Sequence, residues 1–246
     1  MKFKAVLKFL LLFTFVLVLN TTFAETSVND SSRSSENTEQ TTVQAENESG
    51  NRNGTYTTFL ILTAVAIAAI FGTIPLLTKL KSYFAAKVMT HASHKDTFWN
   101  ASELKKHAEK TFYEIQDAWE NRNMAKVKDA VDENLYVEYT ALLAPMIERH
   151  EKNILSQIQI DEIRIIGCED HIDNSKDRYI AYIQGRLLNY VINEDTQEII
   201  KNPSKTLSNF SESYHFVRNN DNWILEKIDT AVTIQDIIQS KNSIEG

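Results

Sequence analysis

The residues of this sequence that could do acid–base chemistry lie in its C-terminal half. An Asp or Glu base beside a Tyr donor is one catalytic arrangement, and the candidates for it are Tyr182, Tyr190, Tyr214, Asp117, Glu212 and His215. No spacing-specific motif connects them, and the chain has no Gly-rich phosphate loop, nucleophile elbow or His-Glu-x-x-His. We therefore expect core tyrosines and solvated carboxylates, and we predict no catalytic and no cofactor-binding residues.

The sequence gives equally little support for a metal site or a catalytic cysteine. His91 and His94 would lie one turn apart on a helix, but no Cys or third ligand is near them, so we predict no metal site. The single cysteine, Cys168, cannot form a disulfide within the chain, as expected in a reducing compartment. It follows an apolar run that ends at Gly167, so we interpret it as a core cysteine at a strand end, with a catalytic thiol as the alternative.

Helices are predicted in the first part of this half. Apolar residues recur at three- and four-residue steps from Leu104 through Phe112 to Trp119, with charged residues on the other face. A second, broken helical region runs over 124–150, with Pro145 near its last turns.

Strands are predicted after these helices. Residues 154–168 are Ile-rich with two-residue spacing and a shift at Asp161 and Glu162 that indicates a bulge. Residues 178–192 are predicted as a long strand with a bend at Gly185, and the predicted strands 210–218 and 223–228 flank an Asn-rich hairpin turn. His215 lies between Tyr214 and Phe216 on the predicted strand, so its side chain faces solvent if their side chains point into the core. Residues 233–240 are predicted as a short helix.

This order predicts an α+β fold, in which N-terminal helices pack on a curved antiparallel sheet that wraps them into a cone. Between residues 98 and 240 there are sixteen Lys and Arg against twenty-five Asp and Glu, so the domain is acidic. An acidic surface disfavours polyanions, and we predict no nucleic-acid partner.

Two apolar stretches precede this domain. Residues 1–24 have a basic start, a short apolar run and small residues at Thr22 and Ala24, which predicts a cleaved signal peptide. Residues 57–78 carry no charge and are long enough to cross a hydrocarbon core of roughly 30 Å. We therefore predict one transmembrane helix.

The lysines predict the orientation of this helix. Lys79, Lys81 and Lys87 follow it closely, which places the C-terminal domain in the cytoplasm by the positive-inside rule. The signal peptide predicts the same arrangement, with residues 25–55 outside as a polar, disordered spacer. Residues 79–97 would connect the helix to the domain. The predicted location is the cell membrane, with a single pass.

The domain resembles the family of the mitochondrial inner-membrane import-motor scaffold, translocase subunit forty-four, in its membrane-anchored bacterial form. The resemblance is carried by residues 112–119 (FYEIQDAW), 121–127, 160–166, 182–186 and the hairpin 214–225. It implies a cone-shaped fold like that of nuclear transport factor two, and a role in holding protein partners at a membrane. The chaperone-binding part of the mitochondrial scaffold has no counterpart here, so a role in protein import does not carry over.

We therefore predict a noncatalytic interaction module that holds a protein partner at the cytoplasmic face of the membrane. Its core or groove would comprise Phe112, Trp119, Tyr182, Tyr214, Phe216 and Trp223, with Lys79, Lys81 and Lys87 near the lipid bilayer. The alternative is a membrane-tethered enzyme or a domain that binds a small apolar ligand in the cone. A deep pocket with an inward carboxylate and hydroxyl would favour the alternative. A third possibility, an envelope sensor, is weakened by the featureless spacer.

Overall fold

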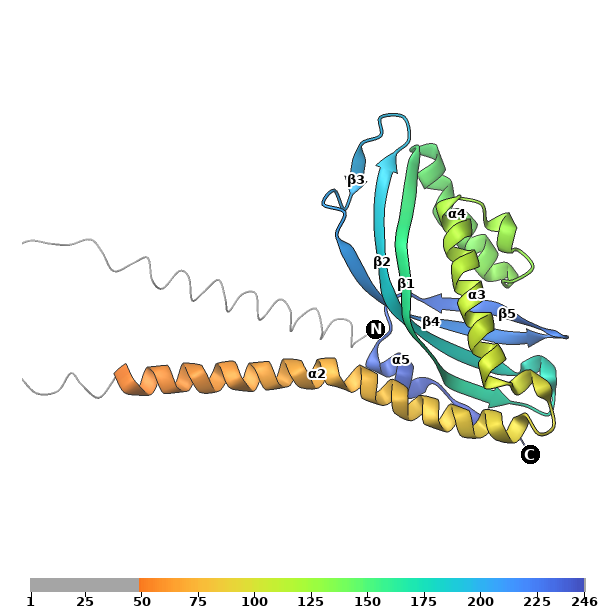
Figure 1. The fold of residues 1–246 in the computed structure, drawn as a ribbon, viewed down its shortest axis with the longest axis horizontal. Coiled ribbons are helices and arrows are strands. Elements are labelled where there is room, and N and C mark those ends of the chain that lie inside the picture. The colour runs from red at the N-terminus through yellow and green to blue at the C-terminus, as the bar shows by residue number, and fades with distance from the viewer. Residues whose placement is uncertain (1–48, 246) are drawn as a thin grey trace, which may run out of the picture. The chain divides into compact units, whose positions relative to one another are not determined.

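The computed structural model describes residues 49–245, and within its first helix the side chains of residues 49–62 and 64–71 are outside this description. The predicted signal peptide and most of the predicted spacer therefore lie outside the described residues. The chain divides into two compact units, 1–56 and 57–246, and the second of these contains the sheet (Figure 1).

The first described helix is α2, Ser49–Ala92, which includes Pro75. Among the described residues, no helix is long and apolar enough to cross a membrane, so the predicted membrane helix and its single pass have no support here. Most of the predicted span, 57–78, consists of positions whose side chains are outside the description.

Helices α3 and α4 follow α2, at the places that the apolar periodicity predicts. Helix α3 spans Ala101–Glu120 and begins after Asn100, whose side chain accepts hydrogen bonds from the amides of Ser102 and Glu103. Helix α4 spans Glu133–Glu148, and Asp132 caps it in the same way. A short 3₁₀ helix, Met124–Val127, interrupts the second predicted helical region. Pro145 lies inside α4.

The sheet has six strands in the described part of the chain. Their order is β5-β4-β2-β1-β6, and β3 pairs with β2. The strands span β1 Glu151–Asp170, β2 Arg178–Asn193, β3 Ile199–Lys201, β4 Leu207–Asn219, β5 Asn222–Asp229 and β6 Asn242–Ile244. Asn219 pairs with Asn222, which confirms the predicted hairpin turn.

The prediction of a wholly antiparallel sheet was wrong, because β6 pairs with β1 in parallel. Helix α5, Ile234–Gln239, lies between β5 and β6 and returns the chain to the far edge of the sheet in the direction of β1. The fold is therefore α+β with helices against a curled mixed sheet. Helices α3 and α4 lie on the concave side of the sheet, and α5 lies beside α2 (Figure 1).

The sheet curls where the long strands are irregular. The register of β1 against β2 shifts between Ile160 and Glu162, as predicted, and at two further points. Gly185 pairs with Phe210 on β4. A Cβ at this glycine would lie 2.2 Å from the carbonyl oxygen of Gln159 and 2.8 Å from the Phe210 ring, so only glycine fits there without a shift of the backbone.

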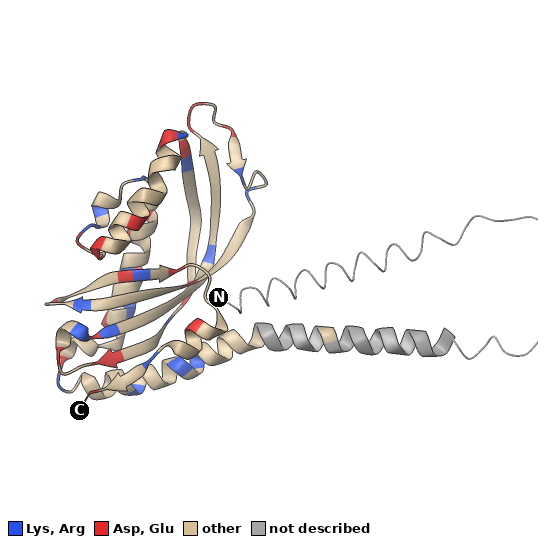
Figure 2. Ribbon diagram, turned by 180° about the vertical axis from the view of Figure 1, so that it is seen from behind, with Lys and Arg blue, Asp and Glu red and all other residues tan. Residues whose placement is uncertain are grey.

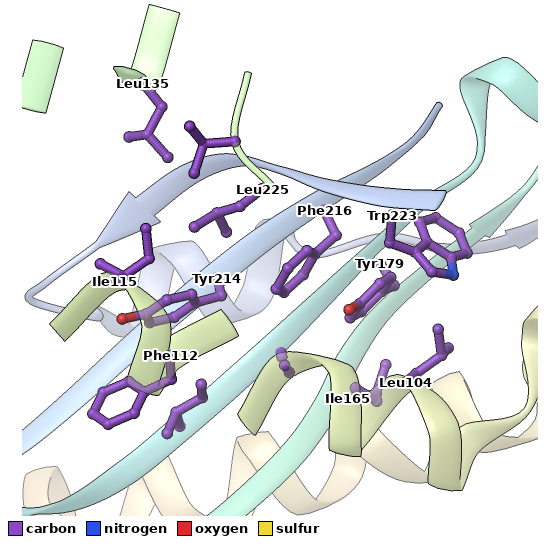
Figure 3. Packing of buried hydrophobic residues seen from close by; sticks show 14 of the residues in the cluster. Leu104, Phe112, Ile115, Leu135, Ile165, Tyr179, Tyr214, Phe216, Trp223 and Leu225 are labelled. Atoms are coloured by element: carbon purple, nitrogen blue, oxygen red, sulfur yellow. The ribbon is translucent and has the colours of Figure 1, made fainter. Parts of the chain in front are cut away.

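The main core lies between α3 and the concave face of the sheet. Leu104, Phe112 and Ile115 from α3 face Tyr179, Tyr214 and Phe216 from the strands (Figure 3). The rings of Tyr179 and Phe216 stack with their centres 4.4 Å apart. A smaller cluster of Ile166, Tyr182 and Ile237, with Ile74 and Leu77 of α2 against it, packs separately from this core.

Candidate functional site

A cavity of about 600 Å³ opens between α3, α4 and the strands. Its helical walls come from Gln116, Trp119, Tyr139 and Leu142, and its sheet wall includes Glu212 and Tyr214 on β4. This volume is in the range of pockets that bind small ligands or single side chains of a partner. The cavity is therefore the candidate functional site.

Glu212 is the carboxylate on the sheet wall of this cavity. It pairs with Ile183 across the β4–β2 ladder, and Ile183 is fully buried in the main core, so the Glu212 side chain shares the concave face. The Tyr214 hydroxyl donates a hydrogen bond to Glu212 Oε2 at 3.2 Å. Burial raises the pKa of Glu212 to about 7, although the hydrogen bond from Tyr214 acts in the opposite direction.

Two aromatic side chains form the wall beside this carboxylate. The Trp119 and Tyr139 rings meet edge to face with their centres 5.6 Å apart. Burial and the nearby charge of Glu212 raise the pKa of Tyr139 to about 12, so this hydroxyl stays protonated at physiological pH. Burial likewise raises the pKa of Tyr214. On this wall of the cavity, the Glu212 carboxylate therefore lies among neutral hydroxyls and rings.

The other charged groups of the lining are mostly engaged in ion pairs. Asp229 pairs with Lys227 at 2.7 Å and with His215 at 2.9 Å. Glu226 pairs with Arg178. Burial lowers the pKa of His215, with opposing effects from Asp229. His215 is partly buried and hydrogen-bonded to Asp229, so the prediction of a solvent-facing histidine was incomplete.

The six residues predicted for the core or groove fall into three groups. Trp119 and Tyr214 line the cavity. Phe112, Phe216 and Trp223 are buried core residues behind it: Phe112 stacks on Phe210 with ring centres 5.3 Å apart, and Trp223 meets Trp99 edge to face. Tyr182 lies away from the cavity, in the cluster with Ile166, where its hydroxyl donates to Ser211 Oγ at 3.1 Å. Strand alternation explains this, because Tyr182 is adjacent to the inward Ile183.

The remaining acid–base candidates lie apart from the cavity. Asp117 is on the exposed side of α3 and pairs with Lys126 at 2.7 Å. Tyr190 lies under the ammonium of Lys205. Cys168 is fully buried in β1, and burial raises the pKa of its thiol. Of the six residues first considered for acid–base chemistry, only Glu212 and Tyr214 meet in the cavity.

The three lysines after the predicted span have different surroundings. Blue segments, which mark Lys and Arg, lie on the described part of α2 (Figure 2). Lys81 Nζ donates to the carbonyl oxygens of Ile238 and Ser240, at 2.8 and 2.6 Å, and so caps the end of α5. Lys87 Nζ lies 4.6 Å from the Tyr83 ring centre, and Lys79 is exposed. Lys81 thus has a structural role that its sequence position did not indicate.

Metal binding has no candidate in the structure as described. No group of three or more His, Cys, Asp or Glu residues that could hold a metal ion occurs among the described side chains. His91 is in the last turn of α2, and His94 follows it in a turn.

Sequence reasoning found only part of the cavity wall. It predicted Trp119 as a groove residue but did not predict Tyr139 and Gln116 on the helices, or Asn153 on β1, as site residues. A signal was present for Glu212, because it alternates in phase with Phe210, Tyr214 and Phe216 on β4. An acidic residue in an inward-facing aromatic series indicates a cavity or a buried partner.

Comparisons with known proteins identify the domain. No curated protein matches the sequence. Three similar solved structures are the intermembrane-space region of the chloroplast protein ARC6 (8% identity, TM-score 0.40, 55% of this chain and 98% of that one), a variant of Rd1NTF2_05 (16%, 0.30, 50% and 96%) and a de novo β-sheet design protein (8%, 0.30, 53% and 88%).

The profile of the Tim44-like domain matches residues 85–230, which is more than half of the chain and includes α3, α4, the five strands β1 to β5 and the cavity. The chain therefore belongs to the Tim44-like domain family.

Proposed function

We propose that this chain is a noncatalytic scaffold module that holds a protein partner, with the cavity between α3, α4 and the sheet as its contact site. The observation that carries the proposal is the family match over residues 85–230, because Tim44-like domains generally bind protein partners. The cavity adds a concave, partly apolar surface of a size that an inserted partner side chain or loop would fill.

The proposal includes a location at the cytoplasmic face of the cell membrane. Its support comes from the sequence: an uncharged apolar stretch over 57–78, an apolar N-terminal stretch behind Lys2, Lys4 and Lys8, and lysines that follow residue 78. In this arrangement the anchor lies within α2, the rest of α2 after residue 78 leads to the domain, and the partner is held close to the bilayer.

A second candidate function is an enzyme or small-ligand domain that uses the same cavity. The observation that favours it is the inward carboxylate of Glu212 hydrogen-bonded to the Tyr214 hydroxyl. A carboxyl group whose pKa is raised to about 7 is suited to general acid–base chemistry near neutral pH.

Site-specific photo-crosslinking in the native membranes tests the first proposal. Leu142 lines the cavity and is 50% exposed, so a benzoylphenylalanine placed there would reach a bound partner. Ile172 is 77% exposed and is not part of the cavity lining, which makes it the matched control. We expect one defined protein adduct from position 142 and none from position 172.

Failure to capture a protein partner would turn attention to the second candidate function, an enzyme or ligand-binding domain. If the full-length protein is folded and neither position captures a protein, the scaffold proposal fails. A thermal-shift screen of small molecules against the wild type and Glu212→Gln would then test the enzyme or ligand-binding reading. A stabilising compound that loses its effect in Glu212→Gln would support that reading.

A further inference from the structure

The cavity has a lining that changes from apolar to charged. Leu135, Leu142, Leu155, Leu187 and Ile228 contribute hydrocarbon surface to it. The aromatic pair Trp119 and Tyr139 adds ring surface, and Glu212 supplies a carboxylate. A ligand that fits this lining has an apolar stem and a polar head.

Among the described side chains, Glu212 is the partly buried lining carboxylate that has no ion pair, whereas the other unpaired one, Glu138, is exposed. Its one recorded hydrogen bond comes from the neutral Tyr214 hydroxyl, and within the described part of the chain no Lys, Arg or His forms an ion pair with it. The only cationic side chain among the lining residues, Lys227, is held by Asp229 at 2.7 Å. Glu212 is therefore available to an incoming cation.

The net negative charge of the lining residues excludes a ligand with an anionic head. Four carboxylates line the cavity against one lysine: Glu138, Glu212, Glu226 and Asp229. A phosphate or carboxylate ligand would meet repulsion from Glu212 without a free cation to offset it. A cationic head, in contrast, would pair with Glu212 and would also be attracted to the faces of the Trp119 and Tyr139 rings.

We propose that the cavity binds an organic cation with an apolar stem, an alkylammonium or a guanidinium, with its charge at Glu212 and its stem against the leucine-rich wall. Such a group is present in a Lys or Arg side chain of a protein and in a free aliphatic amine. The protein source rests on the proposed scaffold function, whereas a free amine would bind whether or not a protein partner exists.

Binding of a cation is coupled to the protonation of Glu212. Because burial raises the pKa of Glu212 to about 7, a cation that needs the ionised carboxylate displaces its proton below that pH. From pH 6 to pH 8 the affinity should therefore rise about tenfold. The titratable and charged groups that face Glu212 from the packed elements are Glu138 and Tyr139 on α4, Tyr214 on β4, and Glu226, Lys227 and Asp229 on β5.

The test is calorimetric titration of the full-length chain with two probes, hexylammonium and a blocked tripeptide with a central lysine. Hexanol and the same tripeptide with an acetylated lysine ammonium are the neutral controls. We expect one or both cationic probes to bind and the neutral controls to bind at least about tenfold more weakly. Binding of hexylammonium points to a free amine as the source, and binding of the tripeptide alone points to a partner side chain.

Two matched variants locate the site. Glu212→Gln keeps the size and an acceptor for Tyr214 but removes the charge, so it should weaken cation binding about tenfold or more at pH 8 and abolish the pH dependence. Glu138→Gln removes the charge of an exposed lining carboxylate, and it should change the affinity less than about threefold. Equal losses in both variants would overturn the assignment to Glu212.

The wild-type comparison alone can also overturn the proposal. If the acetylated tripeptide and hexanol bind as tightly as the cationic probes, or if no probe binds, the cavity is not a cation site, whatever the folding of the variants. Partner capture at position 142 that persists unchanged in Glu212→Gln would then leave the scaffold function intact. Binding of the amine without capture of any protein partner would contradict the proposed scaffold function and support the proposed cation site.

Discussion

At the scale of single residues, Glu212 is a carboxylate in surroundings that favour an apolar side chain. It lies on the concave face of β4 between the inward rings of Phe210 and Tyr214, where an apolar residue would ordinarily pack. Its neighbour Tyr214 is fully buried and donates to it. An uncompensated carboxylate in such a place costs stability, which is typical of functional positions.

The stability of the protein should therefore depend on pH through Glu212. The folded-state pKa of about 7 lies above the ordinary value of 4.5, so folding favours the protonated form. This contribution is fully present below about pH 4.5 and is lost as the pH rises through about 7. Glu212→Gln, which is neutral at every pH, should be more stable than the wild type by about 1–3 kcal/mol at pH 8 and nearly equal to it at pH 4.5.

Urea unfolding of both proteins at these two pH values measures the difference. A Glu212→Gln variant that is no more stable than the wild type at pH 8 would show that the carboxylate is better solvated or better paired than its burial indicates. The exposed Glu138→Gln is the control, because its charge is lost without a change in burial.

At the scale of elements, a buried arginine connects three separate parts of the fold. Arg218, near the end of β4, is 8% exposed. Its guanidinium contacts Asp96 at the start of the 3₁₀ helix Thr97–Trp99 and lies 4.1 Å from the Phe98 ring. It also donates to Asp177 at 3.1 Å, in the connection between β1 and β2. These contacts join the segment after α2 to the sheet.

Removal of this guanidinium should destabilise the domain strongly. Arg218→Met leaves Asp177, which is fully buried, without its cation, and should cost about 3–5 kcal/mol. The double variant Arg218→Met with Asp177→Asn should recover part of that cost, with a coupling energy of at least about 1 kcal/mol. A double-mutant cycle in urea measures it, and strictly additive losses would contradict the coupling.

Lys81 connects α2 to α5. Its ammonium satisfies two carbonyl groups at the end of α5, so Lys81→Met should expose the backbone of 234–244 to exchange with solvent, with a local loss of about 1–3 kcal/mol. Hydrogen exchange followed by mass spectrometry resolves this segment. Lys79→Met is the matched control, since Lys79 is exposed on the same helix. Unchanged protection in Lys81→Met would show that the cap is dispensable.

At the scale of the whole molecule, the proposed arrangement places residues 25–55 and the domain on opposite sides of a membrane. This can be tested with a membrane-impermeant maleimide and single cysteines introduced as Ser35→Cys or as Asp221→Cys in the exposed β4–β5 turn. Cys168 is fully buried and its thiol pKa is raised, so it should add little background labelling.

In intact cells we expect labelling of position 35 and none of position 221, with both labelled after permeabilisation. Labelling of position 221 alone would reverse the proposed orientation. Protection of both positions in intact cells would contradict an external N-terminal segment.

The sequence by itself determined the type and order of the main helices and strands and most of the inward-facing residues, but not the short strands β3 and β6. The three- and four-residue recurrence of Leu104, Phe112 and Trp119 and the alternation around Tyr214 depend only on local geometry, because helix and strand periods decide which side chains share a face. Glu212 alternates in phase with the inward aromatic residues, and the expectation of a solvated carboxylate was wrong there, because the side chain lines the cavity. The resemblance to this domain family rested on these local patterns and was confirmed over residues 85–230, whereas its membrane-anchored bacterial form stays a prediction.

Only the tertiary structure decided how these faces meet. The parallel pairing of β6 with β1, the location of Tyr182 outside the main core and the capping of α5 by Lys81 all depend on contacts between residues far apart in the chain. The cavity has the same origin: Trp119, Tyr139 and Glu212 come from three elements, and the curl of the sheet brings them together. Local periods carry no information on such distances, so the charge of Glu212 acquired its significance only once its neighbours were in place.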